Sequence, residues 1–526
     1  MPRHADRSLL ARNLLAVLAI ALLCQPLALS QKRGPAISLK NRVVLDRISA
    51  DSLRGHLSFI ASDLLEGRDT PSRGLDVAAE YIAAQFRRAG LEAVGDDGYF
   101  QTANWTQMIP NPQGFALTIS HDNRQFSISD QHVSLAYDQG LNLNNAGIVK
   151  VDFNDAAALA ALTEAQVSGH VVITEIPDFR RAERAQAMQI FQALGAFRNR
   201  MQTLRAALIV SIDRTGSNGT GIGTRRLVNP DNPQGQGRMQ NVPILTLHDA
   251  QAATLFDELK AGPADATLSL KAPPATERPV KLRNVIGLLR GSDPVLKDTY
   301  VMVTAHYDHV GIRPGGAGDN IFNGANDDGS GTVSVIELAA ALATRHPRPK
   351  RSIVFMTVFG EEKGLLGSRY YGQHPIFPIE KTIADINLEQ VGRTDSTEGP
   401  QLNNATLTGF DFTDLGPLFK AAGKLTGINV YKHEQNSDAY FGRSDNQALA
   451  DQGVPAHTLC VAFDYPDYHG AGDHWDKIDY ENMAKVDRMV ALALLMLADS
   501  RQEPKWNEAN PKTAKYVAAW KKRHTG

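Results

Sequence analysis

The stretch that decides the fold runs from residue 300 to residue 309 and reads YVMVTAHYDH. Its first six residues, 300–305, form a short apolar run with β-branched side chains, which predicts a buried strand. Similar runs follow at 352–359 (SIVFMTVF), 382–388 (TIADINL) and 456–463 (AHTLCVAF). Continuous apolar strands of this kind are typical of a parallel sheet that is covered on both faces.

Segments with helical periodicity alternate with these strands. Helices are expected at 76–89, 331–345, 363–371, 414–425 and 482–499. In the first of them apolar residues recur on one face, and Gly90 provides a stop signal. The alternation predicts an α/β fold with a mainly parallel central sheet flanked by helices.

A different pattern of short strand-like runs, such as 171–174, interrupts the chain before this region. We therefore expect a smaller β-rich domain at 135–275, inserted into a main domain made of 31–134 and 276–503. The remaining residues, 504–526, carry several lysines and are expected to form a solvated basic tail.

Composition excludes several classes of protein. The chain has 526 residues, of which 43% are hydrophobic and 21% are charged, as in ordinary globular proteins. Lys and Arg number 55 and Asp and Glu number 57, so the whole chain has no charge that favours nucleic acid or an anionic membrane. Only Cys24 and Cys460 occur, which excludes a disulfide framework and a Cys-rich metal site. We expect Cys460 to be an inert core residue.

The first thirty residues have the pattern of a secretory signal peptide. Three arginines precede an uninterrupted apolar run at 14–23, and Ala-Leu-Ser at 28–30 predicts cleavage after residue 30. The apolar run has about half the length of a membrane-spanning helix, so an uncleaved anchor is the minority alternative. We therefore expect an exported chain, periplasmic or secreted, with no stable membrane insertion after cleavage of 1–30.

Potential metal ligands follow the end of each predicted strand. They are His306, Asp308 and His309 after the first, Glu361 and Glu362 after the second, Glu389 after the third and His469 after the fourth, with Asp327 and Asp328 in the glycine-rich loop 324–331. In open α/β sheets, ligands bind outside the carboxyl ends of the strands, so these side chains are expected in one crevice. Imidazoles with carboxylates suit zinc, cobalt or manganese, and more than four ligand groups indicate two ions.

Taken singly, these residues have ordinary structural explanations. An aspartate in a glycine-rich loop is usually a turn or cap residue, and paired glutamates usually lie on the surface. Their coincidence at one predicted edge favours a metal site, and the sequence has no Gly-x-Ser-x-Gly, Walker A or His-Glu-x-x-His motif that would compete. Asp308 could in addition accept a hydrogen bond from the far nitrogen of the His306 ring and fix its tautomer.

In this order, five motifs resemble the signature of the dizinc exopeptidases related to bacterial leucyl aminopeptidase and glutamate carboxypeptidase II. They are HYDH at 306–309, NDDGSG at 326–331, GEEKGLLGS at 360–368, NLEQVGR at 387–393 and YHGAGD at 468–473. The resemblance covers about 284–499 and extends weakly to 57–91, where LLEGR precedes the first predicted helix. More faintly, the inserted segment resembles the protease-associated domain of exported members.

The resemblance implies the zinc-dependent exopeptidase fold and two Zn²⁺ per chain, with Co²⁺ or Mn²⁺ as substitutes. The implied ligands are His306 and Glu389 at one ion, Glu362 and His469 at the other, and Asp327 as the bridge. Glu361 matches the general base, which takes a proton from the attacking water and delivers it to the leaving amine. Tyr468 matches a hydrogen-bond donor to the developing oxyanion, with packing as its alternative role. His309 receives no assignment.

Two positions depart from the family pattern. Most members have Asp where Glu389 stands, and Thr-Pro where this chain has Gly470 and Ala471. These changes leave the metal spacing and the specificity open.

The resemblance implies a dizinc aminopeptidase that acts on peptide substrates, and the signal-peptide pattern predicts that it is exported. Alternatives on the same site are a carboxypeptidase or dipeptidase and a glutaminyl cyclase with a single zinc, although His306 argues for two metals. A receptor-like homologue without catalysis is a further alternative, which the intact ligand set and base oppose.

Overall fold

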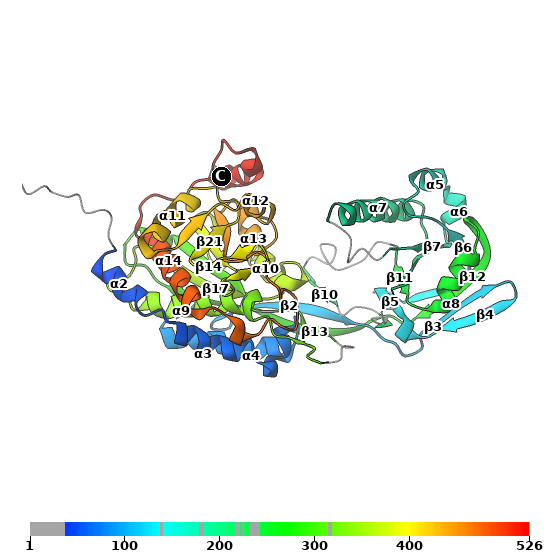
Figure 1. Ribbon diagram of the computed structural model, residues 1–526, viewed down its shortest axis with the longest axis horizontal. Helices are drawn as coiled ribbons and strands as arrows, with labels where there is room; N and C mark the ends of the chain where they lie inside the picture. Colours follow the sequence, from blue (N-terminus) through cyan, green and yellow to red (C-terminus); the bar gives the residue numbers. More distant parts are fainter. Residues whose placement is uncertain are drawn as a thin grey trace, which may run out of the picture. The chain divides into compact units, whose positions relative to one another are not determined.

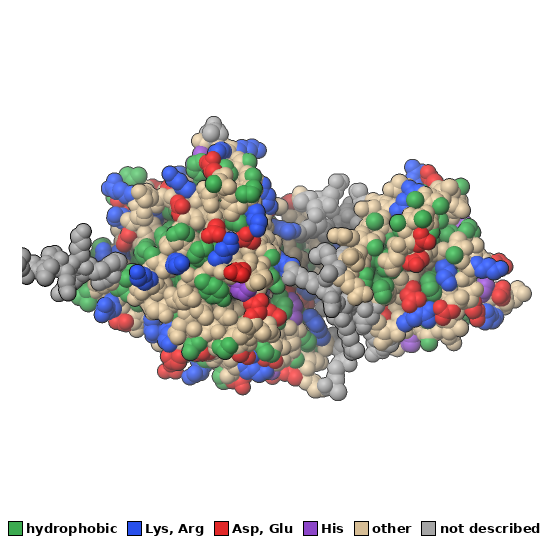
Figure 2. Space-filling model, turned by 45° about the horizontal axis from the view of Figure 1, so that its top comes forward, with side chains coloured by type: hydrophobic (Ala, Val, Ile, Leu, Met, Phe, Trp, Pro, Cys, Tyr) green, Lys and Arg blue, Asp and Glu red, His purple; other side chains and the backbone are tan. Residues whose placement is uncertain are grey.

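The structure is a computed structural model that describes 37–136, 140–177, 184–215, 221–222, 226–231, 242–313 and 318–524. The expected signal peptide lies outside these residues. The chain folds into two compact units (Figure 1). Unit 1 comprises Arg73–Val94, Ile286–Gly526 and the chain up to Asp69, and unit 2 comprises Thr70–Ser72 and Gly95–Val285. On the face drawn in Figure 2, basic and acidic side chains are interspersed over both units.

Unit 1 is built on a central, mainly parallel sheet, which confirms the predicted fold class. Its central strands include β14 (Tyr300–His306), β17 (Ser352–Val358), β18 (Thr382–Leu388), β23 (Ala456–Cys460), β21 (Asn404–Leu407) and β22 (Asn429–Tyr431). In spatial order β17, β14, β18 and β23 are parallel neighbours, and β21 joins β23 antiparallel. Every residue of β14, β17 and β18 is buried, as the unbroken apolar runs require.

Helices cover this sheet (Figure 1). They are α3 (Ala50–Ile60), α4 (Arg73–Ala89), α9 (Gly331–Ala343), α10 (Leu366–Gln373), α11 (Leu415–Thr426), α13 (Asn446–Asp451) and α14 (Tyr480–Asp499). Helix α9 packs on β14, β17 and β18 and also on α3 and α4, whereas α13 packs on β18 and β23. Among the described residues, no helix combines the length and the apolar character that crossing a membrane requires.

The predicted helices are present, with shifts at their ends. Two helices begin three residues from the expected position: α4 begins at Arg73 instead of residue 76, and α10 begins at Leu366 instead of residue 363. Glu361–Lys363 form the short 3₁₀ helix η5 instead, and Gly360 and Gly364 on either side adopt positive φ of 68° and 101°. Because these backbone angles break a helical run, the paired glutamates sit in a turn at the sheet edge rather than on a helix.

The expected basic tail is not a free tail. Helix α15 (Ala514–His524) folds back onto unit 1, and Trp506 and Tyr516 are buried in its core with rings stacked at 4.9 Å. The indole nitrogen of Trp506 donates to the main-chain oxygen of Gly453. The basic side chains do lie on the surface, where Lys512 and Lys515 pair with carboxylates. Burial of Trp506 and Tyr516 thus attaches this segment to unit 1 although it carries several basic residues.

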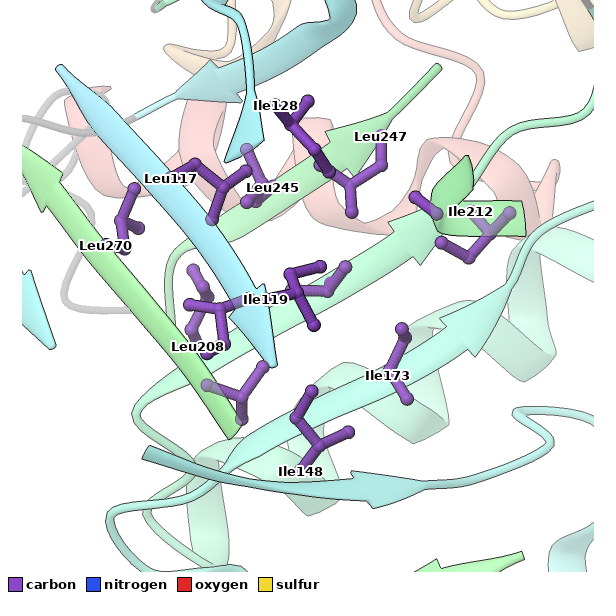
Figure 3. Close-up of a cluster of buried hydrophobic side chains, with 14 of the residues drawn as sticks. Leu117, Ile119, Ile128, Ile148, Ile173, Leu208, Ile212, Leu245, Leu247 and Leu270 are labelled. Atoms are coloured by element: carbon purple, nitrogen blue, oxygen red, sulfur yellow. The ribbon is translucent and has the colours of Figure 1, made fainter. Parts of the chain in front are cut away.

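Unit 2 contains a separate sheet of order β4-β3-β12-β6-β7-β8-β11-β5-β9. The strands are β3 (Ala116–His121), β4 (Arg124–Ile128), β5 (Val133–Ala136), β6 (Leu141–Lys150), β7 (Val171–Glu175), β8 (Leu208–Ile212), β9 (Gly221–Ile222), β11 (Ile244–Leu247) and β12 (Gly262–Ala272). Isoleucines and leucines of β3, β6, β7, β8, β11 and β12 form one buried cluster (Figure 3). An apolar core of its own is what an inserted domain requires.

The boundaries of unit 2 differ from the expected 135–275. The main segment of the unit begins at Gly95, and the pairing of β3 with β12 shows that residues before 135 belong to its sheet. It extends to Val285 because β2 (Phe100–Ile109) pairs antiparallel with the first part of β13 (Thr276–Leu289). Its likeness to a protease-associated domain stays a prediction.

His457 of β23 gives unit 1 a predictable pH dependence. The ring is fully buried, donates from Nδ1 to the main-chain oxygen of Thr408 at 2.7 Å, and accepts at Nε2 from the Thr413 hydroxyl at 2.7 Å. Burial lowers the pKa of His457 to about 4. Between pH about 6.5 and about 4, His457 therefore binds a proton in the unfolded chain but not in the folded chain.

We expect the free energy of unfolding to fall as pH drops from about 6.5 to about 4, by at most about 3 kcal/mol from this group. Urea denaturation at pH 7.5 and pH 5 measures the loss in the wild type and in His457→Gln. The variant should be less stable at both pH values but should show a smaller difference between them. An equal difference in both proteins would assign the pH dependence to other groups.

Candidate metal centre

The carboxyl edge of the unit 1 sheet carries the predicted ligands. His306 is the last residue of β14, Glu362 lies in η5 just after β17, and Glu389 follows β18 directly. Asp327 lies in the loop before α9, and His469 lies in the loop after β23. Five segments that are far apart in sequence therefore meet at one edge, as the topology of the sheet demands.

The five side chains converge on two points. Nε2 of His306 lies 3.3 Å from Oδ1 of Asp327, and Nε2 of His469 lies 3.0 Å from Oδ2 of Asp327 and 3.2 Å from Oε1 of Glu362. His306, Asp327 and Glu389 each offer one ligand atom within 4.8 Å of the others. Asp327 thus presents one carboxylate oxygen to each group, as a bridging ligand would.

The chemistry of this donor set fits divalent cations. Among the described residues, Nε2 of His306 and Oε1 of Glu362 are buried without a hydrogen-bond partner, which is costly unless another group satisfies them. Burial, together with the charge of Asp327, raises the pKa of Glu389 to about 7. Burial lowers the pKa of His469, but its contacts with Asp327 and Glu362 outweigh this and raise it to about 10. Bound cations would supply the positive charge that this crowded edge demands, and no thiolate competes for them.

Hydrogen bonds from backbone amides hold the loop of Asp327 in place. The carboxylate of Asp473 accepts from the amides of Asn326 and Asp327 at 3.0 and 3.1 Å. The side-chain oxygen of Asn326 in turn accepts from the amides of Gly392 and Arg393. The Asp327 loop is therefore tied to the loop after Glu389 and to the loop after His469.

Asp308 orients the centre in a different way from the one expected. Nδ1 of His306 lies 3.2 Å from the main-chain oxygen of Asp308 but 3.6 Å from its carboxylate, so the carbonyl accepts the hydrogen bond. This bond still leaves Nε2 free to bind a metal. The Asp308 carboxylate accepts instead from the amide of Glu361 at 3.1 Å, and so holds the candidate base.

Arg68 is a supporting residue whose role the sequence did not reveal. Its guanidinium is fully buried and donates to four main-chain oxygens, those of Ile60, Tyr307, Asn323 and Gly324. Tyr307 follows the ligand His306, and Gly324 opens the loop of Asp327. Burial lowers the pKa of Arg68 only to about 10, so the group stays charged among the acidic side chains.

Glu361 lies beside both groups of ligands and belongs to neither. Burial and then the charges of Glu389 and Asp445 raise its pKa well above the ordinary value, against the opposing effect of His306. It lines a cavity of about 220 Å³ together with Asp327 and Glu389. A carboxylate in this place can exchange a proton with a molecule in the cavity.

Tyr468 and Cys460 also line this cavity, together with the aromatic rings of Tyr440 and Phe463. The ring of Tyr468 stacks on that of His469 at 4.2 Å, so packing and a hydroxyl directed at the cavity are both compatible with its place. Cys460 is buried as predicted, and burial raises the pKa of its thiol, which stays neutral. Its position in the cavity wall was not predicted.

His309 is the residue at the centre that the sequence reasoning left without a role. It lies with Asp327, Glu362 and His469 in one group of potential ligands. The spacing His306-x-Asp308-His309 could have suggested it, but the direction of its side chain depends on the turn after β14.

Comparison with known proteins agrees with this arrangement. Residues 284–494 match the model of peptidase family M28, a range that holds every predicted ligand and the candidate base. Residues 284–494 belong to peptidase family M28. The family resemblance inferred from the motifs is thereby confirmed for this M28 region.

Curated relatives match over limited lengths. Aminopeptidase YwaD of Bacillus subtilis is 26% identical over 282 residues, which cover 52% of this chain and 56% of the relative. A probable zinc metalloprotease of Pyrenophora teres f. teres is 38% identical over 135 residues, which cover 25% of this chain and 28% of the relative. The chain thus spans little more than half the length of the first and less of the second.

Solved structures support the fold along most of the chain. The aminopeptidase from Aneurinibacillus sp. strain AM-1 superposes with a TM-score of 0.57 at 20% identity, covering 89% of this chain and 97% of that one. A zinc aminopeptidase from Bacillus subtilis superposes with a TM-score of 0.53 at 18% identity, covering 89% and 98%. The zinc exopeptidase fold is therefore shared beyond the M28 region.

Proposed function

We propose that this protein is a zinc-dependent aminopeptidase that removes N-terminal amino acids from peptides. The observation that carries the proposal is the convergence of five potential ligands beside Glu361, which lines a cavity and belongs to neither ligand group. The five are His306, Asp327, Glu362, Glu389 and His469. Relatives named aminopeptidase and zinc metalloprotease support it.

The ligand sets would hold two zinc ions, with Co²⁺ or Mn²⁺ as substitutes, and Asp327 would bridge them. Bound there, the ions would polarise the scissile carbonyl and lower the pKa of the attacking water. Glu361 accepts the proton of that water and delivers it to the leaving amine, because its carboxylate lines the cavity and belongs to neither ligand group. The Asp308 carboxylate fixes the main chain of Glu361 during this exchange.

Tyr468, which also lines the cavity, is the candidate hydrogen-bond donor. Burial and the surrounding carboxylates raise its pKa well above the ordinary value, so the phenol keeps its proton. A protonated hydroxyl at the cavity can donate to the developing oxyanion. The cavity, whose lining includes the rings of Tyr440 and Phe463, receives a side chain of the peptide. We also propose that the protein is exported, on the strength of the signal-peptide pattern at 1–30.

The proposal predicts a defined set of substrates. We expect chromogenic amides of free amino acids to be cleaved and their N-acetylated versions to be refused. Removal of metal by a chelator should abolish the activity, and zinc should restore it. Release of C-terminal residues would point to a carboxypeptidase, cyclisation of N-terminal glutamine to a cyclase, and binding without turnover to a receptor-like homologue. Each of these outcomes would replace the aminopeptidase proposal.

A further inference from the structure

His309 lies as close to Glu362 as the expected ligand His469 does. Nδ1 of His309 lies 2.9 Å from Oε1 of Glu362 and 4.0 Å from Oδ2 of Asp327. The imidazole meets that of His469 edge to face, with ring centres 5.5 Å apart. Four donor atoms, two nitrogens and two oxygens, therefore surround one point.

The approach of His309 to Glu362 is not a hydrogen bond. Neither ring nitrogen of His309 has a hydrogen-bond partner among the described residues, although the side chain is fully buried. The two atoms are thus close without the alignment that an N–H donor would take. Two lone pairs directed at a shared cation explain both the short distance and the misalignment.

The spacing of the four donors agrees with a tetrahedral centre. Ligand bonds of 2.0–2.1 Å place the corners of a tetrahedron about 3.3 Å apart. The separations here, which join His309, Asp327, Glu362 and His469, are 2.9, 3.0, 3.2 and 4.0 Å. They lie on both sides of the ideal value.

The backbone is shaped to admit this ring. Gly324 has a φ of +57°, and a Cβ at this position would lie 2.3 Å from Cγ of His309. A side chain there would push the imidazole away from the centre. The main-chain oxygen of Arg68 accepts a hydrogen bond from the main-chain amide of His309 at 3.3 Å and so fixes the backbone that carries the ring.

We propose that His309 is a metal ligand and that the two sites differ in coordination. His309, Asp327, Glu362 and His469 form a site with four protein ligands, whereas His306, Asp327 and Glu389 form a site with three. This inference rests on the proposed zinc-dependent function. Four protein ligands close a zinc site, and three leave a position for water or substrate.

The cavity provides independent support for this asymmetry. Asp327 and Glu389 of the three-ligand site line it beside Glu361, whereas the shared Asp327 is the one member of the four-ligand site in its lining. The molecule that enters the cavity therefore meets the three-ligand site.

Zinc binding tests the proposal without an assay of activity. Competitive chelator titration should show two zinc ions per wild-type chain, and His309→Ala should weaken one of them more than 100-fold while the other keeps its affinity. His309→Asn, whose amide can donate to Glu362 but is a poor zinc ligand, should not restore binding. His374→Ala, a histidine outside both groups, is the matched control and should bind as the wild type does.

X-ray absorption of the zinc-loaded wild type needs no variant. Three histidines over two ions should give about 1.5 imidazoles per zinc, whereas a purely positioning His309 gives about one. One imidazole per zinc, or full recovery of zinc affinity in His309→Asn, would overturn the proposal. A wild type that binds no zinc would overturn the proposed function itself, and so the two failures are distinguishable.

Discussion

Replacing Glu361 by Gln is expected to lower turnover by about 10²–10⁴-fold, the usual contribution of a general base, or more if no other group takes the proton. The glutamine side chain is almost the same size as the glutamate side chain, but it cannot accept the proton. The substitution leaves the hydrogen bond from the main-chain amide of residue 361 to Asp308 in place. Because Glu361 belongs to neither ligand group, zinc content should stay at the wild-type level. Steady-state kinetics with a free-amine substrate and zinc analysis of the same sample measure both quantities.

The matched control is the neighbouring ligand. Glu362→Gln should lose both zinc affinity and activity, because Oε1 of Glu362 faces His309 and His469. The pair of variants thus separates proton transfer from metal retention at adjacent positions. Full activity in Glu361→Gln would remove this residue from the mechanism, and loss of zinc in the same variant would make it a ligand instead of a base.

Replacing Arg68 by Met is expected to destabilise unit 1 by about 3–5 kcal/mol, since a buried charge network loses its cation. Four main-chain oxygens lose their donor, and the guanidinium no longer offsets the nearby charge of Asp308 and Asp473. Arg68→Lys should recover only part of the loss, because one ammonium has at most three donors for four oxygens.

Urea denaturation measures this loss, and zinc titration measures its consequence for the centre. Tyr307 and Gly324 flank ligand-bearing segments, so we expect weaker zinc binding as well as lower stability. Arg88→Met is the control, because Arg88 lies exposed on α4 and its removal should change stability by about 0.5 kcal/mol or less. Unchanged stability of Arg68→Met would show that water replaces the lost donors.

The parallel strands and their ligands could be predicted because one rule of topology converts sequence order into place. Once 300–305 and the three later runs are read as parallel strands, the residues after them must meet at one edge. The five expected ligands lie together for this reason. This rule could not predict that the main-chain oxygen of Asp308, and not its carboxylate, accepts the hydrogen bond from His306. That choice depends on the local turn after β14, which leaves the carboxylate to accept from the amide of Glu361.

Other features depend on contacts that no local pattern announces. Arg68 looks like a surface residue until its acceptors, which come from distant loops, are in place. The early start of unit 2 follows from the pairing of β3 with β12, which are far apart in sequence. The segment that contains Trp506 and Tyr516 shows no clear helical or strand pattern of apolar residues, and its lysines therefore predicted a solvated tail. The two aromatic side chains are buried through contacts with distant parts of unit 1.

The bonds of Arg68 also bear on the order in which the protein is completed. Its acceptors Tyr307 and Asn323 lie 239 and 255 residues further along the chain. The whole of unit 2 is therefore synthesised after Arg68 and before these acceptors. Unit 2 has its own core and can form while the N-terminal helices still wait for their partners. Contacts of such long range are slow to close. The metal centre is therefore expected to be assembled last, once both ends of unit 1 have met around this guanidinium.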